Sequence, residues 1–306
     1  MRKNFGAKTW LYPMPVLIVG TYDENGNPNA MNAAWGGIYD TNQVMVCLAD
    51  DHKTTENIKE TGAFTVSFAT ENTVVPCDYV GIVSANDVPD KFARAGFHAQ
   101  KSEHVNAPII EELPMTVECR LIKFNEDGIC IGEIVNVSAD ESILDENGKV
   151  DAKKLDPIIY DTNQVMVCLA DDHKTTENIK ETGACTVSFA TANTVVPCDY
   201  VGIVSANDVP DKFTRAGFHA QKSEHVNAPI IEELPMTVEC RLIKFNEDGI
   251  CIGEIVNVSA DDSILDENGK VDAKKLDPII YDSVAHAYWN FGEKVGQAFS
   301  DGKKIK

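Results

Sequence analysis

The sequence predicts a mainly β fold with short helices, and it contains most of this fold twice. Apolar residues alternate with polar ones, or run unbroken, over short segments typical of strands. Turn-forming residues separate these segments, as at residues 23–28 and 125–128. Strands do not alternate regularly with long helices, so we expect a β-barrel-like domain rather than a doubly wound α/β sheet.

The duplication is visible as a constant offset of 121 positions between residues 39–159 and residues 160–280. Only four pairs differ: Phe64/Cys185, Glu71/Ala192, Ala93/Thr214 and Glu141/Asp262. The tripeptide Ile-Tyr-Asp stands at each seam, which indicates unequal recombination at a short shared sequence. Solenoid units are shorter, about 20 to 50 residues, and drift in sequence. We therefore expect two domains, 1–159 and 160–306, of which the second is truncated at its N-terminus.

Composition excludes several classes of partner. The formal net charge is −21, which disfavours a nucleic-acid backbone or an anionic membrane surface, since both attract clustered Lys and Arg. Apolar residues make up 43% of the chain and charged residues 25%, enough to bury two cores. The first residues lack a signal-peptide pattern, and no run approaches the ~18 apolar residues of a membrane span. We expect a cytoplasmic protein.

Cysteine usage is that of a reduced chain. There are nine cysteines, an odd number, and no CxxC pair is present. A zinc site is disfavoured because ligand pairs at short spacing are missing, so we expect no metal. No GxGxxG follows a strand, which disfavours a Rossmann dinucleotide site.

The segment that occurs once, residues 1–38, begins with a predicted hairpin. Residues 15–22 read as a strand, residues 23–28 as a turn and residues 29–35 as the returning strand. The repeat continues with a buried strand over 43–49, because its apolar run is unbroken.

Helices and further strands follow in each copy. A short helix is expected over 53–61, closed by Gly62. Then come, in order, a strand over 63–69, helical stretches near 73–80 and 89–95, and a hairpin of strands 115–124 and 129–137. After the second copy the tail is predicted to be a helix, because apolar residues fall on one face of it: Val284, Tyr288, Phe291, Val295 and Phe299.

The first candidate site is the passage from a buried strand into a helix start at residues 49–55. Free backbone N–H groups and the positive end of the helix dipole favour an anion there. Lys53 adds a full charge and Thr54 adds a hydroxyl donor, so a phosphate would be well held. The alternative is that Asp51 or Thr54 only caps the helix and that Lys53 is solvated.

Two further segments carry candidate residues. At 31–37, small residues beside glycines would let a flat ligand approach the backbone, with Trp35 as an aromatic wall; a strand edge with a core tryptophan is the alternative. Near Cys77 a thiol, a carboxylate, a phenol and a lysine lie close in sequence. Cys77 beside Asp78 is not an activated nucleophile, since a neighbouring carboxylate raises a thiol pKa. A Cys–His hydrolase is therefore disfavoured.

Taken together, these segments resemble one family. The motifs are Asn32-Ala33-Ala34-Trp35 after the hairpin, Asp51-His52-Lys53-Thr54, Cys77-Asp78-Tyr79 with Asp90-Lys91-Phe92, and the tail at 287–296. In this combination the sequence is similar to the flavin reductase-like FMN-binding split-barrel proteins, with the flavoredoxin branch nearest. The resemblance implies a six-stranded Greek-key split barrel, here partially duplicated in tandem, FMN held without a covalent bond, and a homodimer.

The resemblance also implies which residues bind the cofactor. In copy one they are Asn32, Ala33, Ala34 and Trp35 along the flavin ring, Ala49, Asp50, His52, Lys53 and Thr54 at the phosphate, and Cys77, Asp78, Tyr79 and Lys91 elsewhere. In copy two the phosphate turn recurs as Ala170, Asp171, His173, Lys174 and Thr175. Copy two has no counterpart of residues 32–35, so its site is expected to be damaged.

The implied chemistry belongs to the cofactor. Hydride from NAD(P)H would reach the flavin, and electrons would pass to free flavin, to another small acceptor or to a redox protein, with no catalytic side chain required. The alternative is a flavoredoxin-type electron carrier without significant NAD(P)H activity; a third hypothesis is a non-functional recombinant. The two copies are expected either to form an intramolecular pseudo-dimer or to leave copy two as a partly folded insertion with exposed strand edges.

Overall fold

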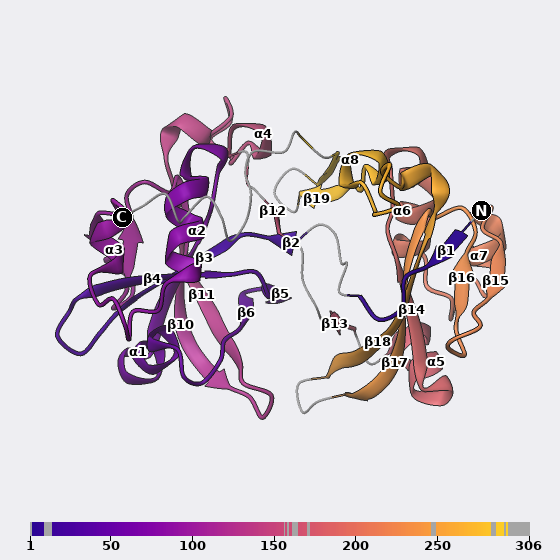
Figure 1. Cartoon of the computed structure of the whole chain (residues 1–306), viewed down its shortest axis with the longest axis horizontal. Coiled ribbons are helices and arrows are strands. Elements are labelled where there is room, and N and C mark those ends of the chain that lie inside the picture. The colour runs from indigo at the N-terminus through magenta and orange to yellow at the C-terminus, as the bar shows by residue number, and fades with distance from the viewer. Residues whose placement is uncertain are drawn as a thin grey trace. The chain divides into compact units, whose positions relative to one another are not determined.

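The computed structural model describes residues 2–8, 14–155, 157, 159–160, 165–169, 172–245, 249–282, 286–290 and 292 (Figure 1). These residues divide into two compact units. One unit contains Met14–Tyr160, which is the unique hairpin followed by copy one. The other joins residues 2–8, from the start of the chain, to copy two and the residues that follow it.

The copy-one unit is built on one curled antiparallel sheet. Its strand order is β4 (Pro28–Ala33), β3 (Leu17–Tyr22), β7 (Ala63–Phe68), β10 (Met115–Phe124), β11 (Ile129–Ala139), β6 (Gln43–Cys47) and β5 (Gly36–Asp40). Although β4 and β5 are close neighbours in the chain, they lie at opposite ends of this order. The sheet therefore curls into an open barrel, which confirms the predicted split barrel (Figure 1).

This sheet has seven strands, one more than the resemblance implied. The additional strand β5 pairs with β6, with Gly36 opposite Val46. A side chain at Gly36 would lie 2.8 Å from Leu17 Cδ1 and 2.8 Å from the Met45 carbonyl oxygen. Close strand packing therefore excludes a side chain at this position.

The helices of this unit follow the sequence pattern closely. Helix α1 (Lys53–Thr61) ends at Gly62, whose φ of 68° lets its N–H bond the Ile58 carbonyl. The other elements are α2 (Val74–Ile82), α3 (Lys91–Arg94), α4 (Ala152–Leu155), the 3₁₀ turns η1 (Glu71–Thr73) and η2 (Glu141–Ile143), and the short strands β2 (Met14–Pro15), β8 (Ala99–Lys101), β9 (Pro108–Ile110) and β12 (Ile159–Tyr160).

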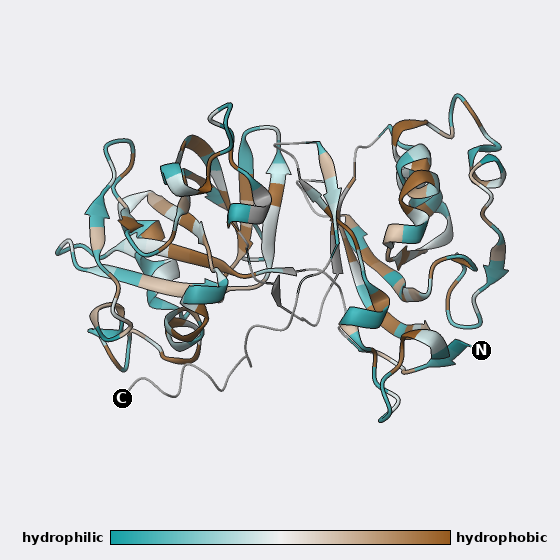
Figure 2. Cartoon of the chain, turned by 90° about the horizontal axis from the view of Figure 1, so that it is seen from above, coloured by the Kyte–Doolittle hydropathy of each residue, from teal (hydrophilic) through white to brown (hydrophobic). Residues whose placement is uncertain are grey.

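Of the hydrophobic clusters that stabilise the copy-one unit, two involve the unique hairpin. One lies within the curled sheet and includes Leu17, Val46, Phe64 and Cys130. The second lies between β3, β4 and helices α2 and α3; it contains Ile18, Ala30, Cys77, Tyr79, Val80, Phe92 and Phe97. In Figure 2, long hydrophobic stretches of ribbon lie along strands and helices, and many of the turns that project outwards are hydrophilic. The hairpin β3–β4 contributes to both clusters, so it is part of the core.

Copy two forms a smaller sheet. Its order is β1 (Arg2–Asn4), β18 (Ile250–Asp261), β17 (Met236–Phe245) and β14 (Ala184–Ser188), with β13 (Val165–Cys168) also paired to β18. Among the described residues, nothing replaces β3 and β4, so β14 pairs on one side only. The remaining elements are α5 (Lys174–Thr182), α6 (Val195–Ile203), α7 (Lys212–Arg215), α8 (Ala273–Leu276), η3 (Ala192–Thr194), η4 (Asp262–Ile264), β15 (Ala220–Lys222) and β16 (Pro229–Ile231).

The tail contains a hairpin where a helix was predicted. Strands β19 (Ile280–Asp282) and β20 (Ala287–Trp289) pair antiparallel, with Tyr281 opposite Tyr288. Their rings lie 5.6 Å apart between centroids, and His286 takes a positive φ of 50° just before β20. The helix prediction was wrong at 287–289, because cross-strand aromatic pairing outweighs the helical spacing. Val284, Phe291, Val295 and Phe299 lie outside the described residues.

Candidate functional site

The start of helix α1 has the properties of an anion site. Its N-cap residue is His52, and no side chain caps the helix. The first four N–H groups of a helix have no partner within the helix, so an uncapped start presents N–H groups to a ligand. Ala49, Asp50 and His52 are exposed and Lys53 is partly exposed. The capping alternative considered for Asp51 or Thr54 is not what the structure shows.

The unique hairpin holds this helix start in place. Asn29 on β4 donates a hydrogen bond of 2.9 Å from Nδ2 to Oγ1 of Thr54. Asn57, one turn further along α1, donates from Nδ2 to Thr21 Oγ1 on β3 at 3.0 Å. All four side chains are buried. The position of the α1 N-terminus therefore depends on β3 and β4, and sequence reasoning missed both asparagines because their partners lie far away in the chain.

Trp35 is connected to the same turn from the other side. The Cys47 N–H at the end of β6 donates to the Trp35 carbonyl oxygen at 2.7 Å. Two residues later the chain enters the turn at Ala49, whose carbonyl oxygen accepts from the Thr55 hydroxyl at 2.7 Å and from the His52 N–H at 3.2 Å. The structure thus brings the predicted ring-binding and phosphate-binding segments to one end of β6.

The charge around Lys53 is mixed. Lys53 Nζ lies 2.7 Å from Glu56 Oε1, and this hydrogen bond is the main cause that raises the lysine pKa. Asp23 adds a weaker attraction to the same ammonium group. Asp50 is 2.9 Å from Lys59 Nζ. An incoming phosphate would therefore compete with Glu56 for Lys53, while the backbone N–H groups remain available to it.

The third predicted segment lies behind β4 rather than in an open site. Asn32 Nδ2 donates to the Cys77 carbonyl oxygen at 3.2 Å, which fastens β4 to α2. Cys77, Asp78 and Tyr79 are all buried. Desolvation raises the pKa of the Cys77 thiol to about 12, so the thiol is not a nucleophile at neutral pH. Ala33 is buried in the barrel core, whereas Ala34 and Trp35 are half-buried.

Lys91 completes helix α2 instead of facing a ligand pocket. Its Nζ donates to the Val80 carbonyl oxygen at 2.9 Å and to that of Val83 at 2.8 Å. A cation at a helix C-terminus is favourable because it meets carbonyl groups that lack partners within the helix. Burial nevertheless lowers the pKa of Lys91 to about 8. The ammonium group of Lys91 is therefore engaged with backbone carbonyl oxygens, and the residue is buried.

Copy two retains the turn but loses its support. Lys174 Nζ pairs with Glu177 Oε2 at 2.8 Å, as Lys53 pairs with Glu56. His173 and Thr175 are exposed, whereas Thr54, the counterpart of Thr175, is buried. The change follows from the missing hairpin, which supplies Asn29 in copy one. Ala170 and Asp171 lie outside the described residues.

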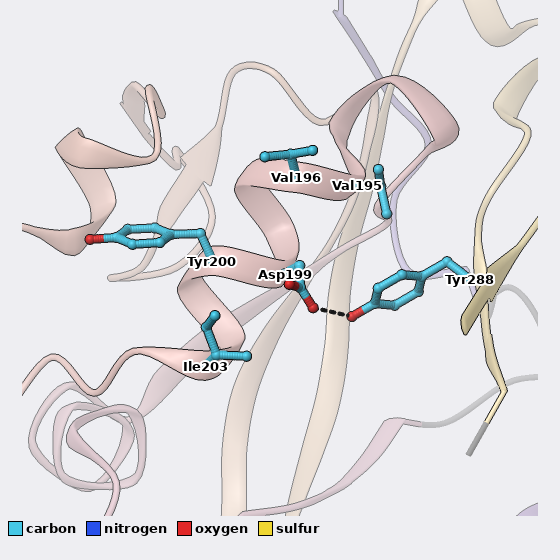
Figure 3. Close-up of a pocket in the computed structure, with 6 residues that line it drawn as sticks. All are labelled: Val195, Val196, Asp199, Tyr200, Ile203 and Tyr288. Atoms are coloured by element: carbon cyan, nitrogen blue, oxygen red, sulfur yellow. Dashed lines mark hydrogen bonds between the residues drawn. The ribbon is translucent and has the colours of Figure 1, made fainter. Parts of the chain in front are cut away.

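The missing hairpin also uncovers helix α6. Val196 is 76% exposed and Ile203 is 75% exposed. A shallow pocket lies here, lined by Val195, Val196, Asp199, Tyr200, Ile203 and Tyr288 (Figure 3). Tyr288 on β20 points towards α6 and donates from its hydroxyl to Asp199 Oδ1 at 2.7 Å (Figure 3). In copy one, β4 packs on the equivalent helix, so the pocket marks the place of the absent strand.

Metal and membrane features were sought in the described residues. No group of three or more His, Cys, Asp or Glu side chains there is placed to hold a metal ion. None of the described helices is long and apolar enough to cross a membrane.

Sequence comparison decides the family. The flavin reductase-like domain matches residues 9–164 and, a second time, residues 157–283. The chain belongs to the flavin reductase-like family. The double match confirms that the family's domain is duplicated in tandem.

The chain is also similar to individual proteins. The flavoredoxin of Desulfovibrio vulgaris (Miyazaki F) is 39% identical, with a TM-score of 0.51 over 57% of this chain and 98% of that one. An FMN-binding domain of a flavin reductase-like enzyme from Shewanella baltica is 20% identical, with a TM-score of 0.43 over 54% of this chain and 96% of that one. An uncharacterised protein of Aquifex aeolicus is 26% identical over 48% of this chain and 79% of its own length.

Proposed function

We propose that this chain is an NAD(P)H-dependent flavin reductase that binds one FMN, in copy one. The observation that carries the proposal is the hydrogen bond from Asn29 to Thr54, through which the unique hairpin supports an uncapped helix start. Family membership supports a flavin as the ligand. Bound FMN would accept two electrons from a nicotinamide and return them singly or in pairs to an acceptor.

The residues of copy one divide the binding between them. The N–H groups at the start of α1 and the ammonium group of Lys53 would hold the phosphate. Trp35 and Ala34, both half-buried, would lie along the ring. Cys77, Asp78, Tyr79 and Lys91 would support the site from behind β4, since all four are buried. The donor set suits a mononucleotide because it offers one helix start and one adjacent cation.

The domain division belongs to the same proposal. Residues 1–159 would carry the complete site and residues 160–306 an incomplete one, since only copy one has the hairpin. Residues 2–8 are the exception to this division, because they pack with the unit of copy two. We further propose a cytoplasmic protein that acts as a homodimer or as an intramolecular pseudo-dimer. Its partners would be a small-molecule electron donor and acceptor, or a redox protein.

Flavin stoichiometry tests the binding site. The purified chain, titrated with FMN and followed by quenching of flavin fluorescence, is expected to bind one FMN per chain. Lys53→Gln should weaken binding about tenfold, because it removes a charge-assisted contact to phosphate. Lys174→Gln is the matched control in copy two and should leave binding unchanged. Two flavins per chain, or equal effects of the two substitutions, would contradict the proposal.

An electron carrier is the second candidate. The likeness to the Desulfovibrio flavoredoxin favours it. The two functions differ in their response to reduced nicotinamides. If the chain is a reductase, the anaerobic FMN-loaded protein mixed with NADH or NADPH in a stopped-flow instrument should lose its visible flavin absorbance at a rate on the order of the ~1–1000 s⁻¹ typical of enzyme turnover. A spectrum that stays oxidised for minutes and is bleached by dithionite identifies the carrier.

A further inference from the structure

The first strand of the chain docks on copy two. Strand β1 pairs antiparallel with β18, with Arg2 opposite Asp261 and Asn4 opposite Ser259. The pairing continues beyond the strand: the Phe5 N–H donates to the Val258 carbonyl oxygen at 2.8 Å, and the Val258 N–H donates to the Gly6 carbonyl oxygen at 2.9 Å. The segment 2–6 therefore completes one edge of the copy-two sheet.

Side chains make this docking specific. Arg2 donates from Nε to Asp261 Oδ1 at 3.2 Å, and its guanidinium also bonds Thr237 Oγ1 and the Leu234 carbonyl oxygen. Lys3 Nζ lies 3.2 Å from Asp262 Oδ1. The contacts with Asn257 are made by Asn4 and by the N–H of Gly6, at 2.9 Å and 3.0 Å. Two cations thus meet two carboxylates at the end of β18.

Copy one carries the same edge. Its strand β11 contains Asn136, Val137, Ser138 and Ala139, and Asp140 and Glu141 follow, in the places of residues 257–262 of copy two. The only difference within this stretch is Glu141 for Asp262, which keeps the charge. Leu113 and Thr116, the counterparts of the other two Arg2 partners, are also present.

In copy one, none of the residues that the structure describes adds a strand to this edge. No described strand pairs with residues 136–139 on the side of β11 that faces away from β10. Val137 is 47% exposed, whereas Val258, its counterpart under the docked segment, is 0% exposed. The difference follows from the duplication: the chain has two copies of the docking edge and one copy of residues 2–6.

We propose that the β11 edge at residues 136–141 is a second docking site for the segment 2–6 of another copy of this chain, which that copy supplies when the segment leaves its own β18. An open strand edge offers unpaired N–H and C=O groups that can be extended by an incoming strand. The carboxylates of Asp140 and Glu141 complement the charges of Arg2 and Lys3. The occupant is identified by the identical edge in copy two, which already binds this sequence.

A peptide in solution is the appropriate probe, because each chain already holds its own segment on β18. A synthetic peptide with the sequence of residues 1–8, labelled at its C-terminus, is titrated with the full chain, and binding is followed by fluorescence anisotropy and calorimetry. We expect one peptide per chain, and a scrambled peptide should not bind. Asp140→Asn should weaken binding about threefold to tenfold, because the partner of Arg2 loses its charge.

Matched variants in copy two separate the two edges. Asp261→Asn should not weaken peptide binding at β11, although it loosens the chain's own segment. A chain lacking residues 2–8 should bind two peptides; Arg2→Glu in the full chain gives the same test without deletion, with stoichiometry rising towards two. The proposal is wrong if the full chain binds no peptide, if the shortened chain binds only one, or if Asp140→Asn has no effect.

Discussion

Asn29 on strand β4 and Thr54 in helix α1 are joined by a buried hydrogen bond of 2.9 Å. Their exposures are 6% and 2%, so neither group has water as an alternative partner. This contact links a segment that occurs once to a segment that occurs twice. The two copies of α1 therefore have the same sequence in different surroundings, and each copy-two residue is a control for its copy-one counterpart.

Substituting Thr54 tests this contact. Thr54→Val leaves the buried Asn29 amide without its acceptor, which should lower the free energy of unfolding by about 1–3 kcal/mol. FMN affinity should fall with it, because the α1 N-terminus loses its support. Urea denaturation and flavin titration measure the two effects. Thr175→Val, at the exposed counterpart, should stay within about 0.5 kcal/mol; equal losses in both variants would refute the role of β4.

Alanine substitutions at two equivalent glycines are expected to change the free energy of unfolding in opposite directions. A Cβ at Gly81 in α2 would lie 2.8 Å from Asn32 Cβ, whereas one at Gly202 in α6 would meet nothing within 4 Å. Gly202→Ala should therefore stabilise the chain by about 0.5–1 kcal/mol through helix propensity. Gly81→Ala should destabilise it by about 1–3 kcal/mol, since β4 must shift. Urea midpoints decide this, and stabilisation by both alanines would show that β4 does not pack on α2.

Thiol labelling should distinguish the same two helices. Cys77 is fully buried with a pKa raised to about 12, whereas Cys198 is half-buried. Cys198 should therefore react with iodoacetamide at pH 8 at least about tenfold faster, since reaction needs an accessible thiolate. Tryptic peptides from the two copies differ at Phe64/Cys185 and Glu71/Ala192, so mass spectrometry separates them. Equal labelling rates would mean that β4 does not cover Cys77.

Lys91 predicts a pH dependence of stability. Burial lowers its pKa from 10.5 to about 8 in the folded chain, so above pH 8 the unfolded chain holds the extra proton. The contribution of Lys91 to the free energy of unfolding therefore rises as the pH increases from about 8 towards 10.5. The buried thiols act in the opposite direction above pH 9, because folding raises their pKa.

Between pH 7.5 and 9, the pH dependence of stability reports on Lys91, because the buried thiols act only above pH 9. In urea denaturation, the stability of the unsubstituted chain relative to Lys91→Met should increase across this range. Lys91→Met should itself be destabilising, because the Val80 and Val83 carbonyl oxygens lose their donor. A difference between the two chains that stays constant with pH would contradict the lowered pKa.

Local signals were sufficient for much of the fold. The turn at residues 23–28 is built as its sequence suggests: Asp23 Oδ1 accepts from the N–H groups of Asn25 and Asn27, and Gly26 takes a positive φ. Helix α1 ends at Gly62 for the reason that predicted it. The anion-binding turn could also be identified, because a helix start after a buried strand is a local pattern.

Features fixed by distant partners could not be predicted. Nothing in the sequence around Asn29 or Asn57 indicates partners on other elements, and the role of Lys91 at the end of α2 depends on how α3 packs. Strand β1 is three residues long, too short for a periodicity signal. The helix predicted for the tail was wrong for a related reason. The spacing of Tyr288 and its neighbours fits a helical face, and the sequence does not show that Tyr281 lies opposite Tyr288 in a hairpin.

The docking of strand β1 on β18 constrains the order in which this chain can fold during translation. Arg2 meets Asp261, 259 positions later, so segment 2–6 receives this partner only after all the residues between the two have been translated. Domains generally fold as they emerge, N-terminal parts first, at about 5–20 residues per second. Between the end of β11 at Ala139 and the start of β18 at Ile250, β11 is already made and β18 is not. A nascent polypeptide arrested in this range will have its segment 2–6 unanchored from copy two.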